Sequence, residues 1–439
     1  MSNVKAQTGF LEKTFKLSEN NTTVKTEILA GITTFMTMAY ILAVNPAMLS
    51  EAGMDWGGVF TATALSAALA TLIMAFYANY PFVLAPGMGL NAYFAYTVVL
   101  QMGYSWQTAL TAVFIEGIIF ILMSFVNVRE AIVNSLPMSL KNAVSAGIGL
   151  FIAFIGLSNA GIVQQGAGTP LALGDLTAPA AIVAILGLII TGILLYKNVT
   201  GAILIGIIAS TIIGIPFGVT PLPEKLFSMP PSLSQVAFKL EFSEIFSLEM
   251  VAVVFAFLFV DVFDTIGTLV GVASKADMLD KDGKLPRVKP ALFADAVGTT
   301  AGALLGTSTV TTYVESASGV AQGGRTGLTA LTSAVLFILA LFFAPIFGII
   351  PNAATAPALI IVGLFMITSI LKINFDDFTE AIPAFLAVIM MPLAYSIAEG
   401  ICFGVISYSV LKLLTGKGKE VSPVMYVLSV LFILKYIFI

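Results

Sequence analysis

The stretch "GTSTVTTYVESASGVAQGGRTG", residues 306–327, decides how this chain folds. It is rich in Gly, Ser and Thr, which favour turns and loops over uninterrupted helix. Apolar runs flank it on both sides, "PALFADAVGTTAGALL" before it and "LTALTSAVLFILALFFAPIFGII" after it. Flexible polar residues, with one acid at Glu315, therefore interrupt a part of the chain that is otherwise apolar enough to cross a membrane.

Composition places the whole chain in a lipid bilayer. Of its 439 residues 58% are hydrophobic and 10% are charged, and the mean hydropathy is +1.01. A soluble protein of this length could not bury so much apolar surface, so we predict a polytopic membrane protein with little mass outside the bilayer. The net charge of −4 is too small to indicate nucleic acid as a partner.

The chain contains no histidine, and Cys402 is its single cysteine. An intramolecular disulfide and a cysteine metal site are therefore excluded, and we predict no metal and no cofactor. Proton chemistry near neutral pH must then use carboxylates, tyrosines or lysines with shifted pKa values.

Apolar runs of membrane length recur along the chain. A helix needs about 20 apolar residues to cross a bilayer, and on that basis we predict fourteen spans. They lie at residues 27–49, 58–78, 82–100, 106–126, 138–158, 178–196, 199–215, 247–272, 289–305, 308–323, 327–349, 353–371, 379–395 and 398–414. A last apolar piece, residues 423–439, either spans the membrane or lies in its interface.

Lys and Arg in the short loops set the predicted orientation. Basic residues at the N-terminus, near Arg129, at Lys197 and across 275–289 fall in alternate loops, which places all of them on one side of the membrane. We therefore predict a protein of the cytoplasmic membrane with its N-terminus in the cytoplasm. This orientation puts the loop 216–246 outside the cell.

A second span is interrupted like 306–327. The segment "YPFVLAPGMGLNAYFAYTVV", residues 80–99, has Pro and Gly in its first half and begins with β-type residues. Asn91 and Glu315 lie about half a chain apart, as do the starts of the first and eighth spans. Seven spans per half is an odd number, so the halves must have inverted topology. Interrupted segments at matching positions of inverted halves point to a transporter's midplane site, where free backbone N–H groups can bind a ligand.

Three acids are the first candidates for that site. Glu315 would cost about 2.5–3.5 kcal/mol at the centre of a lipid-facing helix, so it is expected to face a polar interior. Asp261 and Asp264 lie three residues apart in span eight, on one helix face, where mutual repulsion and burial favour a proton on one of them. The alternatives are a helix cap or a packing hydrogen bond for Glu315, and hydrogen bonds to the backbone of broken helices for the aspartates. Thr265 and Thr268 add hydroxyl groups nearby.

Other polar residues are more ambiguous. Asn91 begins the half-helix of span three, where its amide could bind the edge of a heterocycle or cap the helix. Glu116 and Asp295 are intramembrane acids that we assign to structural networks, and Arg325 to an orientation anchor. Several aromatic residues could stack on a planar ligand, although each taken alone favours packing: Phe35, Tyr40, Phe82, Tyr93, Phe94 and Tyr313.

Four motifs together resemble a known family. They are "APGMGLNAYFAY", "FVDVFDTIGTLVGVA", "GTSTVTTYVESASGVAQGGRTGLTA" and "DDFTEAIPAFLAVIMMPLAYSIAEGI". In this order they resemble the AzgA-like purine permeases of the nucleobase–cation symporter-2 superfamily, from about residue 20 to about residue 420. The resemblance implies an all-α, uracil-permease-like fold of fourteen transmembrane segments in a 7+7 inverted repeat, with two short antiparallel strands where spans three and ten begin.

The resemblance also implies a domain division. A cytoplasmic N-terminus would occupy residues 1–26. Spans one to four and eight to eleven would form a core domain, at 27–126 and 247–349. The remaining spans would form a gate domain, at 127–246 and 350–439.

Carried over residue by residue, the resemblance implies which residues bind the substrate and which carry the proton. The family's span-eight acids fall on Asp261 and Asp264, and its span-ten glutamate on Glu315. Its Gly-x-Asn falls on Gly89 and Asn91. Related uracil permeases have a histidine in span eight, and here Thr268 stands at that place. The predicted substrate-binding residues are Glu315, Asp261, Asp264, Asn91, Gly89, Thr312 and Thr268.

The predicted function is therefore proton-coupled uptake of purine nucleobases by movement of core against gate, with coupling by Asp264, Asp261 and Glu315. The motifs favour guanine and hypoxanthine, with an adenine-preferring permease as the alternative. A homodimer is a family expectation. An anion transporter on the same fold is a rival, because half-helix N-termini attract anions, but three acids oppose it. A membrane enzyme would need a nucleophile, metal or cofactor motif, and we find none.

Overall fold

A computed structural model of the chain describes residues 9–125, 137–166, 168–245, 247–275, 278 and 285–438. Arg129, Lys281 and Lys284, on which part of the predicted orientation depends, lie outside these residues. The described part is a bundle of helices with two short two-stranded sheets.

A first bundle is formed by helices from residues 10–125 and 248–348, which pack mainly on one another. Its elements are α1 (Phe10–Phe15), α2 (Val24–Met38), α3 (Ile41–Glu51), α4 (Trp56–Ile73), η1 (Met74–Ala78), α6 (Trp106–Phe125), α11 (Leu248–Lys275), α12 (Val288–Leu305), α14 (Gly327–Ala340), η3 (Leu341–Phe343) and α15 (Ala344–Gly348). Helix α12 packs on α6 and α4, and α14 packs on α2 and α4.

A second bundle is formed by helices from residues 138–214 and 352–438. Its elements are α8 (Met138–Asn159), α9 (Pro179–Tyr196), α10 (Ala202–Gly214), α16 (Asn352–Ile367), η4 (Thr368–Lys372), α17 (Phe378–Leu393), α18 (Ile397–Leu414), η5 (Gly418–Glu420) and α19 (Pro423–Phe438), with the small hairpin β2 (Val163–Gln164) and β3 (Ala172–Leu173). Helix α8 packs on both α16 and α17.

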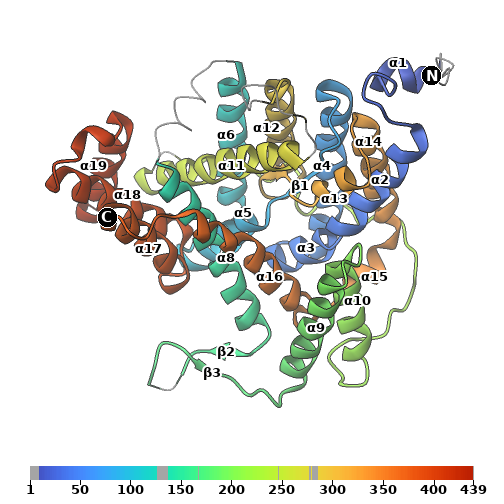
Figure 1. Ribbon diagram of the computed structural model, residues 1–439. Coiled ribbons are helices and arrows are strands. Elements are labelled where there is room, and N and C mark those ends of the chain that lie inside the picture. Colours follow the sequence, from blue (N-terminus) through green and yellow to red (C-terminus); the bar gives the residue numbers. More distant parts are fainter. Residues whose placement is uncertain are drawn as a thin grey trace.

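Two broken spans meet in the first bundle. Strand β1 (Leu84–Pro86) pairs antiparallel with β4 (Val310–Thr312), Leu84 opposite Thr312 and Pro86 opposite Val310. Strand β1 leads into α5 (Met88–Ala92), which continues as η2 (Tyr93–Gln101), and β4 is followed by α13 (Ser316–Ala321). The predicted strands at the starts of spans three and ten are thereby confirmed. Figure 1 shows β1 beside α4 and the end of α11, and α13 next to α2, with α17, α18 and α19 at the opposite side of the view from α2 and α14.

Hydroxyl groups from two flanking helices complete this strand pair. Thr71 Oγ1 of α4 accepts from the N–H of Leu84 at 3.0 Å and donates to its carbonyl at 3.2 Å. Thr299 Oγ1 of α12 does the same for Val310, at 3.2 and 2.9 Å. Extended backbone at membrane depth is tolerated only where its polar groups have protein or water partners. The two threonines come from the second span of each half, as the inverted repeat requires.

Twelve of the fourteen predicted spans coincide with helices of the described residues, and the other two are the broken spans. Among the described residues, nine helices of at least 18 residues are apolar enough to cross a membrane. The remaining predicted spans are the two broken ones, the shorter apolar helices α10 and α17, and the 18-residue α12. The chain is thus a multi-pass membrane protein.

The last apolar segment lies against α18 in antiparallel direction. Ser429 Oγ is 2.7 Å from Ser409 Oγ, near the middle of both helices. Tyr426 near the start of α19 donates to the carbonyl of Gly418 at 3.0 Å, whereas Tyr436 near its end donates to Glu399 near the start of α18. Helix α19 therefore runs along most of the length of a spanning helix.

Candidate functional site

A cavity of about 80 Å³ lies where the two broken spans meet α11 and the second bundle. The two bundles contribute different kinds of side chain to its lining. The first bundle supplies the polar groups, whereas the second bundle supplies apolar side chains. It is lined by Tyr40, Gly87, Met88, Gly89, Leu90, Ile148, Val260, Asp264, Thr268, Thr312, Tyr313, Val314, Glu315, Val362, Phe365 and Met366.

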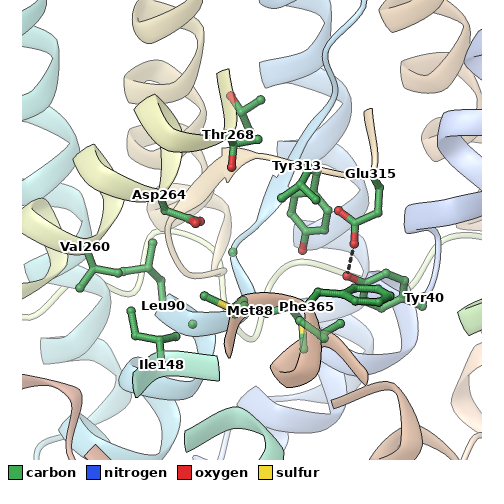
Figure 2. A pocket seen from close by; sticks show the side chains of 16 residues that line it. Tyr40, Met88, Leu90, Ile148, Val260, Asp264, Thr268, Tyr313, Glu315 and Phe365 are labelled. Atoms are coloured by element: carbon green, nitrogen blue, oxygen red, sulfur yellow. Dashed lines mark hydrogen bonds between the residues drawn. The ribbon is translucent and has the colours of Figure 1, made fainter. Parts of the chain in front are cut away.

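Two carboxyl groups face this space from different elements. Asp264 projects from α11, and Glu315 lies at the junction of β4 and α13. Figure 2 shows them on opposite sides of the cavity, with Tyr313 between them and Ile148 and Phe365 on the side of the second bundle. A ligand in the cavity would therefore have hydrogen-bond acceptors on two sides and an apolar surface on a third.

Glu315 is oriented by a tyrosine from the first span. The hydroxyl of Tyr40 donates to Glu315 Oε1 at 2.7 Å (Figure 2). Tyr40 is 1% exposed, so its ring fixes the hydroxyl in place. The carboxylate retains further acceptor positions for a ligand, because an ionised carboxylate has about four lone-pair sites.

Threonines and a tyrosine surround the second acid. Thr311 Oγ1 donates to Asp264 Oδ2 at 3.3 Å, and Thr268 and Thr312 line the cavity nearby. The hydroxyl of Tyr313 donates to the carbonyl of Pro86 at 2.5 Å and so joins the two broken spans. The polar side of the cavity is therefore a hydrogen-bonded frame held by several elements.

The start of α5 offers backbone donors to the cavity. The first backbone hydrogen bond of this helix is donated by the N–H of Asn91 to the carbonyl of Gly87, at 2.8 Å. The N–H groups of Met88, Gly89 and Leu90 precede it and lie among the lining residues. The start of α13 differs, because the N–H groups of residues 316–318 bond to the carbonyls of residues 313–315. One half-helix, and not both, thus presents free donors.

Two glycines allow the close approach of this half-helix to its neighbours. A Cβ on Gly87 would lie 2.3 Å from Thr311 Cγ2, and a Cβ on Gly89 would lie 2.6 Å from Ile148 Cγ2 in α8. Gly89 therefore lies where the half-helix touches the second bundle. Gly89 is a predicted substrate-site residue, and it lines the cavity.

Asn91 and Asp261, two predicted site residues, do not line the cavity. The amide of Asn91 donates to the carbonyl of Pro86 at 3.4 Å and accepts from the hydroxyl of Ser308. It thus ties the strand of one broken span to the other, and it does not cap α5, whose N-cap position is held by Gly87 without a side-chain bond. Asp261 is buried and accepts from Thr265 Oγ1 at 3.4 Å. The structure therefore places both in supporting positions.

The remaining intramembrane acids also lie behind the cavity. Asp295 accepts from Thr265 Oγ1 at 2.7 Å, so Thr265 links it to Asp261. Glu116 is buried within α6. Both are buried in helices of the first bundle, and neither lines the cavity. Among the described residues no group of three His, Cys, Asp or Glu side chains could hold a metal ion.

Sequence reasoning missed several parts of the site. Tyr40 was considered as a stacking partner, not as the donor that orients Glu315. Ile148, Val362, Phe365 and Met366 gave no signal, because apolar residues in apolar helices look alike whether they face lipid, core or ligand. Finding them requires knowledge of which helices face one another across the cavity.

Comparison with known proteins identifies the family of this chain. A sequence model described as the Permease family matches residues 25–403. The guanine/hypoxanthine permease PbuG of Bacillus subtilis is 46% identical, over 97% of this chain and 99% of its own length. The adenine permease AdeP of Escherichia coli is 44% identical, over 98% of this chain and 97% of its own length. The resemblance inferred from the four motifs is thereby confirmed.

The fold also matches a solved structure. The transmembrane domain of a bicarbonate transporter, BicA, from a cyanobacterium superposes with a TM-score of 0.64 at 18% identity. The match covers 85% of this chain and 97% of that domain. At this identity the likeness concerns the fold, and it supports the predicted inverted-repeat architecture.

Proposed function

This chain belongs to the permease family, a family of nucleobase transporters, and from that premise we propose that it takes up purine nucleobases together with protons across the cytoplasmic membrane. Guanine and hypoxanthine are the preferred substrates. The observation that carries this proposal is the cavity in which Asp264 and Glu315 face each other beside the free N–H groups at the start of α5.

The donors and acceptors of the cavity suit a 6-oxopurine. Guanine presents N–H donors at N1 and its 2-amino group next to an acceptor at O6, and hypoxanthine presents N1–H and O6. A carboxylate only accepts, so Glu315 matches the N–H donors, whereas N–H groups of Met88 to Leu90 match O6. Adenine has an acceptor at N1, which would face the carboxylate and repel it. The apolar side chains of Ile148 and Phe365 would contact the ring.

The acids also supply a place for the proton. Two carboxylates around one cavity repel each other, and a charge that moves across the membrane within a protein domain is costly. A proton on Asp264 would remove one charge, and purine N–H groups would compensate the other on Glu315. Loading of proton and substrate together would then favour the crossing, whereas loading of one alone would not.

The position of the cavity between two bundles supports alternating access. We assign the first bundle to the predicted core, residues 27–126 and 247–349, and the second to the predicted gate, residues 127–246 and 350–439. Movement of one against the other would expose the cavity first to one side of the membrane and then to the other. We also propose that the N-terminus lies in the cytoplasm.

Uptake in cells that lack their own purine carriers tests the proposal. Radiolabelled hypoxanthine should accumulate in cells that express the chain, and unlabelled guanine should compete at low concentration. Adenine should compete poorly, because a polar site rejects an analogue that leaves a buried group unpaired. Uracil and bicarbonate serve as controls, since the fold is shared with a bicarbonate transporter.

Two results would decide against parts of the proposal. Adenine as the tightest competitor would favour the alternative, an adenine-preferring permease, which the 44% identity to AdeP leaves open. Accumulation that persists when the proton gradient is collapsed, with hypoxanthine still bound, would exclude proton coupling.

A further inference from the structure

The boundary between the two bundles carries a second set of polar contacts, away from the cavity. Glu51 is the last residue of α3, in the first bundle. Its Oε1 accepts from Asn159 Nδ2 at 3.2 Å and from Asn352 Nδ2 at 3.0 Å. Asn159 ends α8 and Asn352 begins α16, so both donors belong to the second bundle. One carboxylate therefore holds two helices of the facing bundle.

Further bonds continue this line of contacts. Thr97 Oγ1 donates to the carbonyl of Tyr395 at 3.2 Å, and Gln101 Nε2 donates to the carbonyl of Ala394 at 2.9 Å. They join the end of η2 to the turn between α17 and α18. We call this set the seam; its residues are Glu51, Thr97, Gln101, Asn159, Asn352 and Tyr395.

One stripe of α8 leads from the cavity to the seam. Ile148 lines the cavity, and Ile152, Ile155 and Asn159 follow it at intervals of about one helical turn on the same face. Eleven residues of helix span about 16 Å. Ile152 and Ile155 are 0% exposed, so packed apolar side chains fill this part of the boundary. The seam thus lies at the far end of a closed stretch of the boundary.

We propose that Glu51 is the residue that latches the external mouth of the permease shut in this conformation. The inference rests on the proposed alternating access and on the predicted orientation, in which residues 51, 159 and 352 lie on the external side. It goes beyond them by assigning the closing contact. Glu51 does not line the cavity, so it acts on the position of the bundles and not on the substrate.

The chemistry of the contact suits a reversible latch. Hydrogen bonds to a charged acceptor are stronger than bonds between neutral groups, so one carboxylate holds both asparagines firmly. Asn352 is solvent-exposed, and water can replace these bonds once the helices separate. Opening therefore leaves no polar group of the latch without a partner.

Charge exchange at the latch gives a sharp test. Ile155→Cys in a Cys402→Ala background reports opening, because residue 155 is buried one turn below the seam. Asn352→Asp places a second carboxylate beside Glu51, and the repulsion should raise the rate at which an impermeant maleimide labels Cys at 155 in intact cells by about tenfold. Adding Glu51→Gln restores a donor–acceptor pair with the roles reversed, and labelling should fall to within about threefold of the parent.

Controls separate opening from unfolding. Val183→Cys, buried in α9, which packs on α10 and α16 of its own bundle, should stay unlabelled in the Asn352→Asp background. The labelling does not depend on which purine is carried, so it can fail while the uptake experiment succeeds. Parental labelling in Asn352→Asp, a rise that Glu51→Gln does not reverse, or a rise seen only in inside-out vesicles would each overturn the proposal.

Discussion

Glu315 is held by Tyr40 in an orientation that leaves acceptor positions for a ligand, which makes its charge the feature to test first. Glu315→Gln keeps the size of the side chain but presents an NH₂ group where purine N–H donors would approach. A hydrogen bond to a charged group contributes about 1.5–3 kcal/mol, so hypoxanthine binding to purified protein should weaken by about tenfold to a hundredfold.

Tyr40→Phe is the matched control for this prediction. It removes the 2.7 Å bond that orients Glu315 but leaves the carboxylate in place. Binding should weaken by less than in Glu315→Gln, by about threefold to tenfold. Normal binding by Glu315→Gln would show that this acid does not contact the substrate.

Asp264 and Asp261 should respond differently to the same substitution. Asp264→Asn mimics the protonated acid in the cavity, so hypoxanthine binding should survive whereas accumulation driven by an imposed pH gradient should be lost. Asp261→Asn changes a buried partner of Thr265, and its main effect should be a lower thermal stability of the purified protein. Unchanged pH-driven accumulation by Asp264→Asn would remove it from the coupling mechanism.

The different surroundings of these aspartates show what helical spacing predicts and what it leaves open. Residues three apart lie on one side of a helix, yet they are about 60° apart around its axis. Beside a narrow cavity that angle is enough for Asp264 to line it while Asp261 meets Thr265 behind it. The acids themselves were predictable, because charge inside a membrane needs a polar surrounding. Their partners depend on helices distant in sequence.

At the scale of elements, the half-helix α5 depends on its contact with α8. Gly89→Ala would bring its Cβ to 2.6 Å from Ile148 Cγ2, and a β-branched side chain cannot easily move aside. Because this contact joins the two bundles, uptake should fall by about tenfold or more while the protein still folds. Uptake by the variants in cells, with expression checked by immunoblot, measures this.

Ile148→Ala provides the rescue for that variant. It removes the methyl group that the new Cβ would strike, so the double variant should regain part of the uptake lost by Gly89→Ala. No recovery would indicate that Gly89 acts through the substrate site and not through its contact with α8.

The second bundle is held at one end by a buried lysine. Lys412 of α18 is 1% exposed and bonds to Glu380 of α17 and Glu420 of η5, both at 2.7 Å. Lys412→Met would leave the largely buried Glu380 without its cation and should destabilise the protein by about 3 kcal/mol. Thermal unfolding in detergent should show the loss, and Lys412→Met with Glu380→Gln should recover most of it. Equal melting temperatures for all three proteins would contradict this role.

Broken spans were the elements that sequence predicted best. Pro86 and Gly87 in one, and the Ser/Thr-rich run before Glu315 in the other, are incompatible with continuous helix. Their antiparallel pairing is a tertiary contact, which only the resemblance to the purine permeases implied. The threonines of α4 and α12 that complete the pair could not be foreseen, because a threonine within a membrane helix usually bonds to its own backbone.

Across the whole molecule, the apolar half of the cavity shows the limit of reasoning from one sequence. The acids mark the first bundle, but the residues that close the site from α8 and α16 are ordinary hydrophobic residues. Their role arises from the way two bundles meet, and the seam at Glu51 arises in the same way. Features that depend on the relative position of the bundles are also those that would change during transport.

Orientation of the whole chain gives the last prediction. Seven spans in each half place the segment before α2 and the segment before α11 on opposite sides of the membrane. In a Cys402→Ala background, Glu19→Cys should react with an impermeant maleimide only after cells are permeabilised, whereas Glu224→Cys should react in intact cells. Both residues are exposed, so access to the reagent depends on the side of the membrane. Reaction of both on the same side would contradict the inverted repeat. Reaction of Glu19→Cys alone in intact cells would reverse the orientation and place the latch at Glu51 on the cytoplasmic side.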